Sequence, residues 1–180
     1  MKRLIIGISG ASGVELGLKF VKALPLEIEK YIIISEHAKT VFHNEHNLFF
    51  LDDENIGAIT ASGSFKSDGM AIIPCSMNTL AKISYGIADN LLTRTASVMI
   101  KEKRPLLLAP REMPFSAIAL ENMLKLSRLG IHIAPPVLGY YAQIKTLEDM
   151  EDFLIGKWFD LLGIEHQLFK RWEGASQCEE

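Results

Sequence analysis

The chain opens with a short apolar strand that runs directly into a glycine-rich turn and a helix. Residues 3–13 read Arg-Leu-Ile-Ile-Gly-Ile-Ser-Gly-Ala-Ser-Gly, and Val14, Leu18 and Val21 follow at helical spacing. Where such a turn begins a helix, the first backbone N–H groups lack partners and the helix dipole adds partial positive charge. The unit therefore predicts a turn that binds an anionic phosphate.

The residues of the turn agree with this interpretation. Gly7, Gly10 and Gly13 let the backbone approach a ligand closely, and Ser9 and Ser12 supply hydroxyl donors. The spacing is G-x-x-G-x-x-G, which differs from the dinucleotide fingerprint G-x-G-x-x-G. The alternative is a plain strand-to-helix turn that needs small residues only for packing.

Apolar strands and helical segments alternate along the rest of the chain. Further strands are expected over residues 31–34, 70–73, 105–109 and 131–134. Helices are expected over residues 14–24, 76–87, 90–101, 116–128 and 146–162. Thr146 is the expected N-cap of the last helix, with Asp149 as its capping-box partner, and residues 51–55 are interpreted as an acidic loop. This alternation predicts an α/β fold, a single-domain, doubly wound parallel sheet covered on both faces.

Polar side chains follow most of the predicted strands. Parallel sheets of this class bind ligands outside the carboxyl ends of their strands. The groups expected at that edge are hydroxyls, a guanidinium, a carboxylate and phenols, from Ser9, Ser12, Ser35, Ser76, Arg111, Glu112, Tyr140 and Tyr141. A pure scaffold does not need this polar set, so the sequence predicts a ligand site at this edge.

Several cations lie near these strand ends or on the adjoining helices, where they suit a phosphate-bearing ligand. Arg94 and Lys101 are seven residues apart, on roughly one helical face. The alternative for both, and for Lys157, is a solvated surface charge. Arg111 and Glu112 fall between a buried strand and a proline-started helix, where limited exposure is expected, and mutual neutralisation is their alternative.

Composition excludes several classes of protein. The 180 residues are 48% hydrophobic and 23% charged with a net charge of −3, as in a globular domain without a nucleic-acid surface. Cys75 and Cys178 lack metal-ligand spacing, so we expect a reducing compartment, the cytoplasm, without structural disulfides. The histidines show no metal motif, and no metal is assigned. No signal peptide is expected before the first strand, and the apolar runs are too short to span a bilayer.

An ordered set of motifs resembles the flavin prenyltransferase family, UbiX. The motifs are Gly-Ile-Ser-Gly-Ala-Ser-Gly (7–13), Ser-Gly-Ser (62–64), Pro-Cys-Ser-Met-Asn-Thr-Leu (74–80), Ala-Asp-Asn-Leu-Leu-Thr-Arg (88–94), Lys-Glu-Lys-Arg-Pro-Leu (101–106), Arg-Glu-Met-Pro (111–114) and Pro-Pro-Val-Leu-Gly-Tyr-Tyr (135–141). The match covers residues 1 to about 174. It implies a flavin-binding prenyltransferase domain over 1–174 with a C-terminal tail over 175–180.

The resemblance implies a flavodoxin-like fold and a metal-independent reaction. Reduced FMN is alkylated by dimethylallyl monophosphate, and the product is prenylated FMN with a fourth ring across N5 and C6. UbiD-type decarboxylases use that product as their cofactor. Members are typically homododecamers with sites between subunits. The sequence leaves open whether the donor carries one phosphate or two, and which decarboxylase receives the product.

The resemblance also carries roles to particular positions. FMN is expected to be bound by Gly10, Ala11, Ser12, Ser35, Ser76, Met77, Asn78, Thr79 and Arg111. The prenyl phosphate is expected at Tyr141 and Lys157, with Trp172 near the prenyl group. Catalytic polar positions are matched by Glu112, Lys101, Arg94 and Glu45.

Two departures from the family pattern concern the donor rather than the flavin. Lys157 stands where the family usually has Arg, so the charge is kept but the planar two-pronged grip is lost. Ala142, Gln143 and Ile144 stand where many relatives have His-Arg-Pro. Phosphate affinity or donor choice is therefore expected to differ.

Two other functions share parts of this pattern. A flavin-dependent cysteine decarboxylase of the phosphopantothenoylcysteine type has a similar Asn-Thr-Leu-Ala-Lys-Ile run, but its Pro-x-Met-Asn motif is replaced here by Arg-Glu-Met-Pro. A non-enzymatic FMN-binding protein needs the phosphate turn but not Glu112, Lys101 and Tyr141 together. A nicotinamide dehydrogenase is disfavoured by the glycine spacing.

Overall fold

The computed structural model describes residues 2–34, 47–140 and 144–171. The chain forms two compact units, Met1–Pro136 and Val137–Glu180, and each is described by itself. The predicted boundary between domain and tail at residue 174 falls outside the described residues and stays a prediction.

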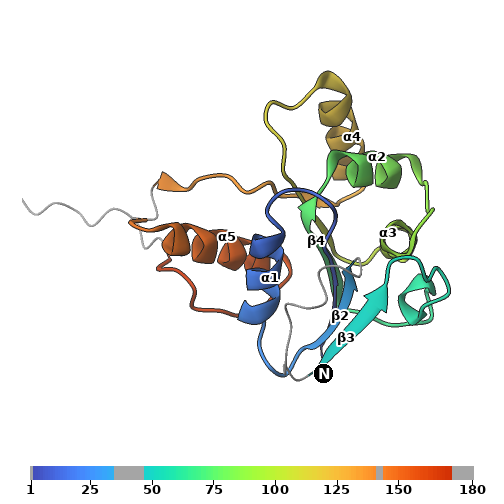
Figure 1. Cartoon of the computed structure of the whole chain (residues 1–180), viewed down its shortest axis with the longest axis horizontal. Coiled ribbons are helices and arrows are strands. Elements are labelled where there is room, and N and C mark those ends of the chain that lie inside the picture. The colour runs from blue at the N-terminus through green and yellow to red at the C-terminus, as the bar shows by residue number, and fades with distance from the viewer. Residues whose placement is uncertain (1, 35–46, 141–143, 172–180) are drawn as a thin grey trace, which may run out of the picture. The chain divides into compact units, whose positions relative to one another are not determined.

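The first unit contains one parallel sheet of six strands in the order β3-β2-β1-β4-β5-β6 (Figure 1). The strands are β1 (Arg3–Gly7), β2 (Glu29–Ile34), β3 (Leu48–Asp52), β4 (Gly69–Cys75), β5 (Leu106–Pro110) and β6 (His132–Ile133). Without the edge strand β3, the remaining five have the flavodoxin-like order, in which the first strand lies between the second and third. The predicted fold class is confirmed.

Helices cover both faces of this sheet (Figure 1). The helical elements of the first unit are α1 (Val14–Ala23), the short 3-10 helix η2 (Ile59–Ala61), α2 (Met77–Tyr85), α3 (Leu91–Lys101) and α4 (Ala117–Arg128). Helix α1 lies on one face, and α2, α3 and α4 lie on the other. The core on the second face joins strand residues such as Ile5 and Ile72 to Leu80 and Met123 of the helices. Burial on both faces explains the near-continuous apolar runs of the central strands.

Two glycines allow helices to approach this sheet closely. A Cβ atom added at Gly17 of α1 would lie 2.2 Å from the backbone oxygen of Ile73 in β4. A Cβ atom at Gly7 would lie 2.1 Å from Cδ1 of Leu92 in α3. Both glycines are therefore needed for packing rather than for ligand access.

The second unit is built around α5 (Leu147–Leu161), the longest helix of the described chain. Thr146 is its N-cap, and Asp149 completes the capping box, as the sequence predicts. In the first unit, the helix expected over residues 116–128 ends at Arg128 as predicted, and Gly130 adopts a positive φ of 81°. Such backbone suits glycine after a helix end.

The edge strand β3 corrects the prediction of an acidic loop over residues 51–55. Leu51 and Asp52 belong to the strand, which pairs in parallel with β2 through Lys30–Leu48 to Ile34–Asp52. An edge strand pairs on one side only and remains half-exposed. It can therefore carry acidic residues at its end, and these resemble a loop in the sequence.

We expect the substitution Gly17→Ala to destabilise the fold by about 1–3 kcal/mol, although alanine is the better helix former. The added carbon meets backbone, which cannot rotate away as a side chain can. Urea unfolding measures the change. The matched control is Gly10→Ala, because nothing described lies within 4 Å of a Cβ added there. Equal stability of both variants would contradict the proposed close approach of α1 to β4.

Candidate functional site

The carboxyl ends of β1, β4 and β5 are tied together by hydrogen bonds. The hydroxyl of Ser9 donates to the carbonyl of Pro74 at 2.9 Å and accepts from the backbone N–H of Ser76 at 2.8 Å. The N–H of Arg111 donates to the carbonyl of Cys75 at 3.3 Å. The segments that follow these strands therefore start from one place at the edge of the sheet.

Ser9 differs from the prediction that it supplies a free hydroxyl to phosphate. Its side chain is buried and both of its hydrogen bonds go to the backbone of β4 and the following residue. A neighbouring position, Ser12, is exposed instead. The two serines of the turn thus have separate functions, one structural and one available to a ligand.

The turn between β1 and α1 leaves room for an anion. Gly13 is the N-cap of α1 with a φ of 103°, and no side chain caps that helix. Gly10 has neither a positive φ nor any described atom within 4 Å of an added Cβ. Packing among the described residues does not explain glycine at this position. The open turn and the uncapped helix start fit a phosphate such as that of FMN.

Helix α2 begins at the same edge, directly after β4. Ser76 is its N-cap, and the Ser76 hydroxyl accepts from the N–H of Thr79 at 3.2 Å and donates to the Thr79 hydroxyl at 3.0 Å. Met77 is half-buried and Asn78 is exposed. Of these four predicted flavin residues, Ser76 and Thr79 hold the start of the helix, and Asn78 is the one most open to a ligand.

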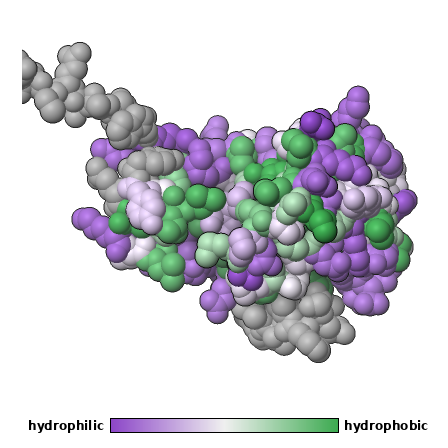
Figure 2. All heavy atoms as spheres, turned by 90° about the horizontal axis from the view of Figure 1, so that it is seen from above, coloured by the Kyte–Doolittle hydropathy of each residue, from purple (hydrophilic) through white to green (hydrophobic). Residues whose placement is uncertain are grey.

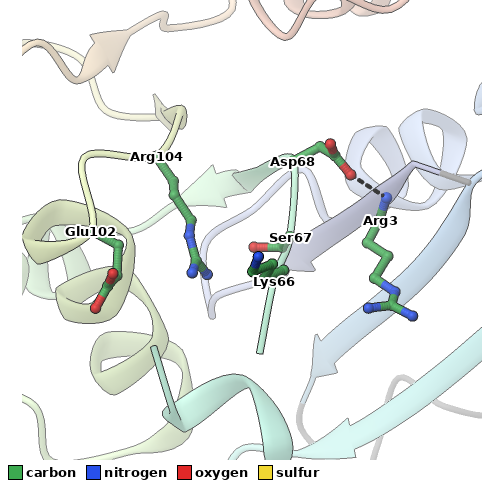
Figure 3. Close-up of a pocket in the computed structure, with 6 residues that line it drawn as sticks. All are labelled: Arg3, Lys66, Ser67, Asp68, Glu102 and Arg104. Atoms are coloured by element: carbon green, nitrogen blue, oxygen red, sulfur yellow. Dashed lines mark hydrogen bonds between the residues drawn. The ribbon is translucent and has the colours of Figure 1, made fainter. Parts of the chain in front are cut away.

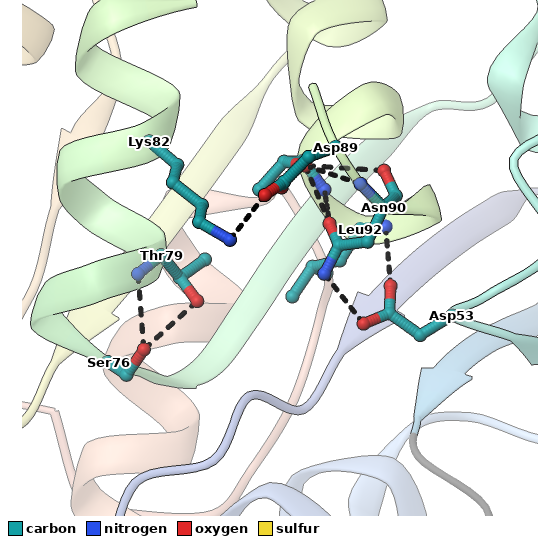
Figure 4. Close-up of polar contacts among 8 residues, drawn as sticks. Asp53, Ser76, Thr79, Lys82, Asp89, Asn90 and Leu92 are labelled. Atoms are coloured by element: carbon teal, nitrogen blue, oxygen red, sulfur yellow. Dashed lines mark hydrogen bonds and ion pairs between the residues drawn. The ribbon is translucent and has the colours of Figure 1, made fainter. Parts of the chain in front are cut away.

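Helix α3 is anchored to the end of β3 by the half-buried carboxylate of Asp53 (Figure 4). Asp53 accepts from the N–H of Leu92 at 2.8 Å and from Nδ2 of Asn90 at 2.7 Å. Asn90 and Thr93 form a capping box. Burial is the largest influence on the pKa of Asp53 and raises it, against the lowering effect of these hydrogen bonds. Asp53 thus holds the start of α3 at the carboxyl edge of the sheet.

The two predicted cations of α3 lie in different surroundings. Arg94 is one turn from the start of the helix, and its Nε donates to the carbonyl of Ala61 at 3.3 Å. Lys101 is the last residue of the helix and forms an ion pair with Glu102. Seven residues of α-helix separate them by about 10 Å along the axis. One chain therefore does not bring Lys101 to the carboxyl edge.

Glu102 lines an open groove of about 520 Å³ at the amino ends of β1 and β4 (Figure 3). The two arginines that line this groove form hydrogen bonds to other groups of the same chain. Arg104 donates to the carbonyls of Phe65 and Gly63 at 2.6 and 2.7 Å, and Nε of Arg3 donates to Glu29 at 2.7 Å. The groove is thus a feature of the opposite edge of the sheet from the phosphate turn.

Arg111 and Glu112 are both exposed, which corrects the expectation of limited exposure. No ion pair joins them within the described structure, and the Glu112 carboxylate accepts from the N–H of Met113 at 3.0 Å. Mutual neutralisation is therefore wrong for this pair. Both residues lie in the segment after β5 with their side chains exposed. They therefore have no packing role among the described residues.

The remaining predicted site residues lie outside the first unit or outside the described residues. Lys157 is an exposed residue of α5 in the second unit. Four others belong to the part of the chain that the structure does not describe: Ser35, Glu45, Tyr141 and Trp172.

Neither a metal site nor a membrane span is found where the structure describes the chain. Among residues 2–34, 47–140 and 144–171, no three or more His, Cys, Asp or Glu side chains cluster as metal ligands would. None of the described helices is long and apolar enough to cross a bilayer. Burial raises the pKa of the Cys75 thiol to about 12, so this cysteine is not an activated nucleophile.

Sequence reasoning missed the residues that position this edge. Asp53 gives no local signal, since its partners are 37 and 39 residues away. Asn90 was detectable as a cap, because Asn directly before a helical segment favours that position. At the opposite edge, Arg104 holds the segment around Gly63 and gives no pattern of its own in the sequence.

Comparison with known proteins places the chain among flavoproteins, since the Flavoprotein family matches residues 1–159. The flavin prenyltransferase UbiX of Helicobacter pylori (strain ATCC 700392 / 26695) is 52% identical over 94% of this chain and 98% of its own length. The flavin prenyltransferase UbiX of Campylobacter jejuni is 46% identical over 95% of this chain and 98% of its own length. The chain belongs to the UbiX family of flavin prenyltransferases.

Solved structures agree with this assignment. A dodecameric FMN-dependent UbiX-like decarboxylase from Escherichia coli O157:H7 has a TM-score of 0.87 at 40% identity, over 96% of this chain and all of that one. AnUbiX, solved with FMN and dimethylallyl pyrophosphate, has a TM-score of 0.89 at 37% identity, over 97% and 99%.

We expect the substitution Asp53→Ala to destabilise the fold by about 1–3 kcal/mol, because it leaves the Leu92 N–H and the Asn90 amide without their acceptor. Urea unfolding at neutral pH measures the loss. Asp52→Ala is the matched control, since among the described residues the Asp52 side chain accepts only a local bond, from the N–H of Glu54 at 3.1 Å. A loss as large in the control would show that Asp53 does not anchor α3.

Proposed function

We propose that this chain transfers a dimethylallyl group from dimethylallyl monophosphate to N5 and C6 of reduced FMN, making prenylated FMN. The observation that carries the proposal is the near-full-length identity to flavin prenyltransferases. The open phosphate turn of the first unit supports it, because Gly10 and the uncapped start of α1 suit the phosphate of a flavin nucleotide.

The flavin is held at the carboxyl edge of the sheet. Gly10, Ala11 and Ser12 bind the FMN phosphate through the turn, together with Ser35. The start of α2 lines the flavin through Met77 and Asn78, and Ser76 and Thr79 keep that helix start in place. Arg111, exposed beside the end of β4, contacts the same nucleotide.

The reaction needs positive charge at the donor phosphate. Breaking the allylic C–O bond produces a carbocation and inorganic phosphate, and a bond forms from the prenyl group to N5 before the ring closes at C6. Arg94, Lys101 and Lys157 stabilise the negative charge that develops on the leaving phosphate. Tyr141 binds that phosphate, and the aromatic face of Trp172 stabilises the cation.

Proton transfer completes the reaction. Alkylation of N5 releases a proton, and ring closure takes a proton onto the prenyl double bond and releases the one on C6. Glu112 or the departing phosphate accepts and returns these protons. The exposed carboxylate of Glu112 follows the same strand as Arg111, at the edge where the flavin is expected. Glu45 is a second polar group of the site.

Assembly explains why one chain does not gather all of these groups. Lys101 lies at the end of α3 that is far from the phosphate turn. We propose that the chain forms a homododecamer, as the Escherichia coli relative does, and that Lys101 reaches the flavin of a neighbouring subunit. Exposed apolar side chains such as Leu120 and Leu124 of α4 are consistent with subunit contacts, and hydrophobic surface is visible in Figure 2.

The product is passed to a UbiD-type decarboxylase, and the reaction takes place in the cytoplasm. Both statements remain predictions. The rival cysteine decarboxylase shares the fold: a phosphopantothenoylcysteine decarboxylase mutant has a TM-score of 0.61 at 21% identity, over 76% of this chain. The Arg-Glu-Met-Pro segment in place of Pro-x-Met-Asn favours prenyl transfer.

Anaerobic incubation of the chain with reduced FMN and dimethylallyl monophosphate tests the activity. We expect mass spectrometry to find a flavin heavier by one five-carbon prenyl unit, and no such product without the donor. Replacing the monophosphate by the pyrophosphate identifies the accepted donor. Unmodified FMN as the only flavin, with folded protein present, would refute the proposal.

The substitution Glu112→Gln tests proton transfer. We expect turnover to fall by about 100-fold while FMN still binds, because the amide cannot accept the proton. Flavin fluorescence measures FMN binding, and Gly10→Val is expected to weaken that binding because its side chain occupies the turn. Glu121→Gln, at an exposed position of α4, is the control. Unchanged turnover in Glu112→Gln would remove this residue from the mechanism.

A further inference from the structure

One carboxylate in the second unit joins α5 to the segment that follows it. Asp160, near the end of α5, accepts from NH2 of Arg171 at 2.8 Å and from NH1 at 3.2 Å. His166 lies against the same carboxylate, with Nε2 at 3.1 Å from Oδ1. The hydrogen bonds from Arg171 are the largest of the influences that lower the pKa of Asp160, which keeps it anionic.

The returning segment is packed tightly against α5. A Cβ atom added at Gly156 would lie 2.5 Å from Phe169 and 2.6 Å from His166. The N–H of Leu168 donates to Nδ1 of His166 at 3.2 Å, so the ring proton is on Nε2 and points to Asp160. The rings of Phe153 and Phe169 pack at 5.1 Å. The position of Arg171 is therefore set by several independent contacts.

This arrangement holds the Arg171 guanidinium on the carboxylate of Asp160, which lies one helical turn along α5 from Lys157. Lys157 and Asp160 are three residues apart on α5, so their Cβ atoms are neighbours at about 5–6 Å. Asp160 uses two of the five N–H donors of Arg171, and 58% of the arginine side chain is exposed. Lys157 and Arg171 are two cations, and Asp160 is the one carboxylate between them in this count. The three side chains together therefore carry a net positive charge.

We propose that Arg171, oriented by Asp160, is a second phosphate-binding residue for the prenyl donor, beside Lys157. The inference rests on the proposed function, which places the donor phosphate at Lys157. A lysine offers phosphate a point charge, whereas a guanidinium offers a planar fork of donors. Arg171 supplies the planar fork that Lys157 of α5 lacks.

Binding of the donor without turnover tests this role. Dimethylallyl monophosphate is titrated by calorimetry into the protein saturated with oxidised FMN, in wild-type, Arg171→Gln and Arg171→Lys forms. We expect Arg171→Gln to weaken binding about tenfold or more, since a charge-assisted hydrogen bond is lost, and Arg171→Lys to fall between the two. FMN affinity stays unchanged. In turnover assays, the KM for the donor rises more than kcat falls.

Inorganic phosphate separates a phosphate contact from a general loss of packing. Its ability to compete with the donor should fall by the same factor in Arg171→Gln, because phosphate has no prenyl group. Lys170→Gln, at the neighbouring exposed position, is the control and should bind like wild type. Arg171→Lys decides the matter if Arg171→Gln does not fold.

The inference is wrong if folded Arg171 variants bind the donor and inorganic phosphate as tightly as the wild type does. A fall in their thermal stability would not rescue it. A wild-type chain that forms prenylated FMN but shows this result leaves the proposed function intact. A wild-type chain that neither binds the donor nor prenylates FMN would overturn both.

Discussion

The hydrogen bonds of the Ser9 side chain determine the form of the carboxyl edge of the sheet, where the flavin phosphate is proposed to bind. One hydroxyl donates to the carbonyl of Pro74 and accepts from the N–H of Ser76, so the ends of β1 and β4 are held at a fixed separation. The turn to α1 and the cap of α2 both start from this link. Because Ser9 is buried, its hydrogen bonds are protected from water, and the neighbouring Gly10 and Ser12 are left open to a ligand.

The charged groups of the first unit are divided between the two edges of the sheet. Arg111 and Glu112 follow β5 at the carboxyl edge, whereas Lys101 and Glu102 end α3 on the way back to the amino edge. A helix of this length cannot present both of its ends to one small ligand. This division is the physical reason for the proposal that a second subunit supplies Lys101.

Much of the architecture was predictable because it is encoded locally. Burial on both faces produces continuous apolar strands, and the Thr146–Asp149 capping box marks the start of α5. The edge strand β3 was not predictable, since its acidic end resembles a loop. The role of Asp53 was hidden because its partners lie on a distant helix. The exposure of Arg111 and Glu112 was misjudged, because neighbouring buried and proline residues do not determine how far a side chain projects.

The amino-acid sequence by itself determined the order of strands and helices, the helix caps, the family and which polar residues follow which strand. These properties depend on periodicity and on residues only a few positions apart. The tertiary structure alone decided which hydroxyl is structural and which is open, which carboxylate anchors α3, and that Arg171 binds Asp160 of α5. Those outcomes depend on hydrogen bonds between residues up to 67 positions apart, whose geometry exists only once the chain has folded.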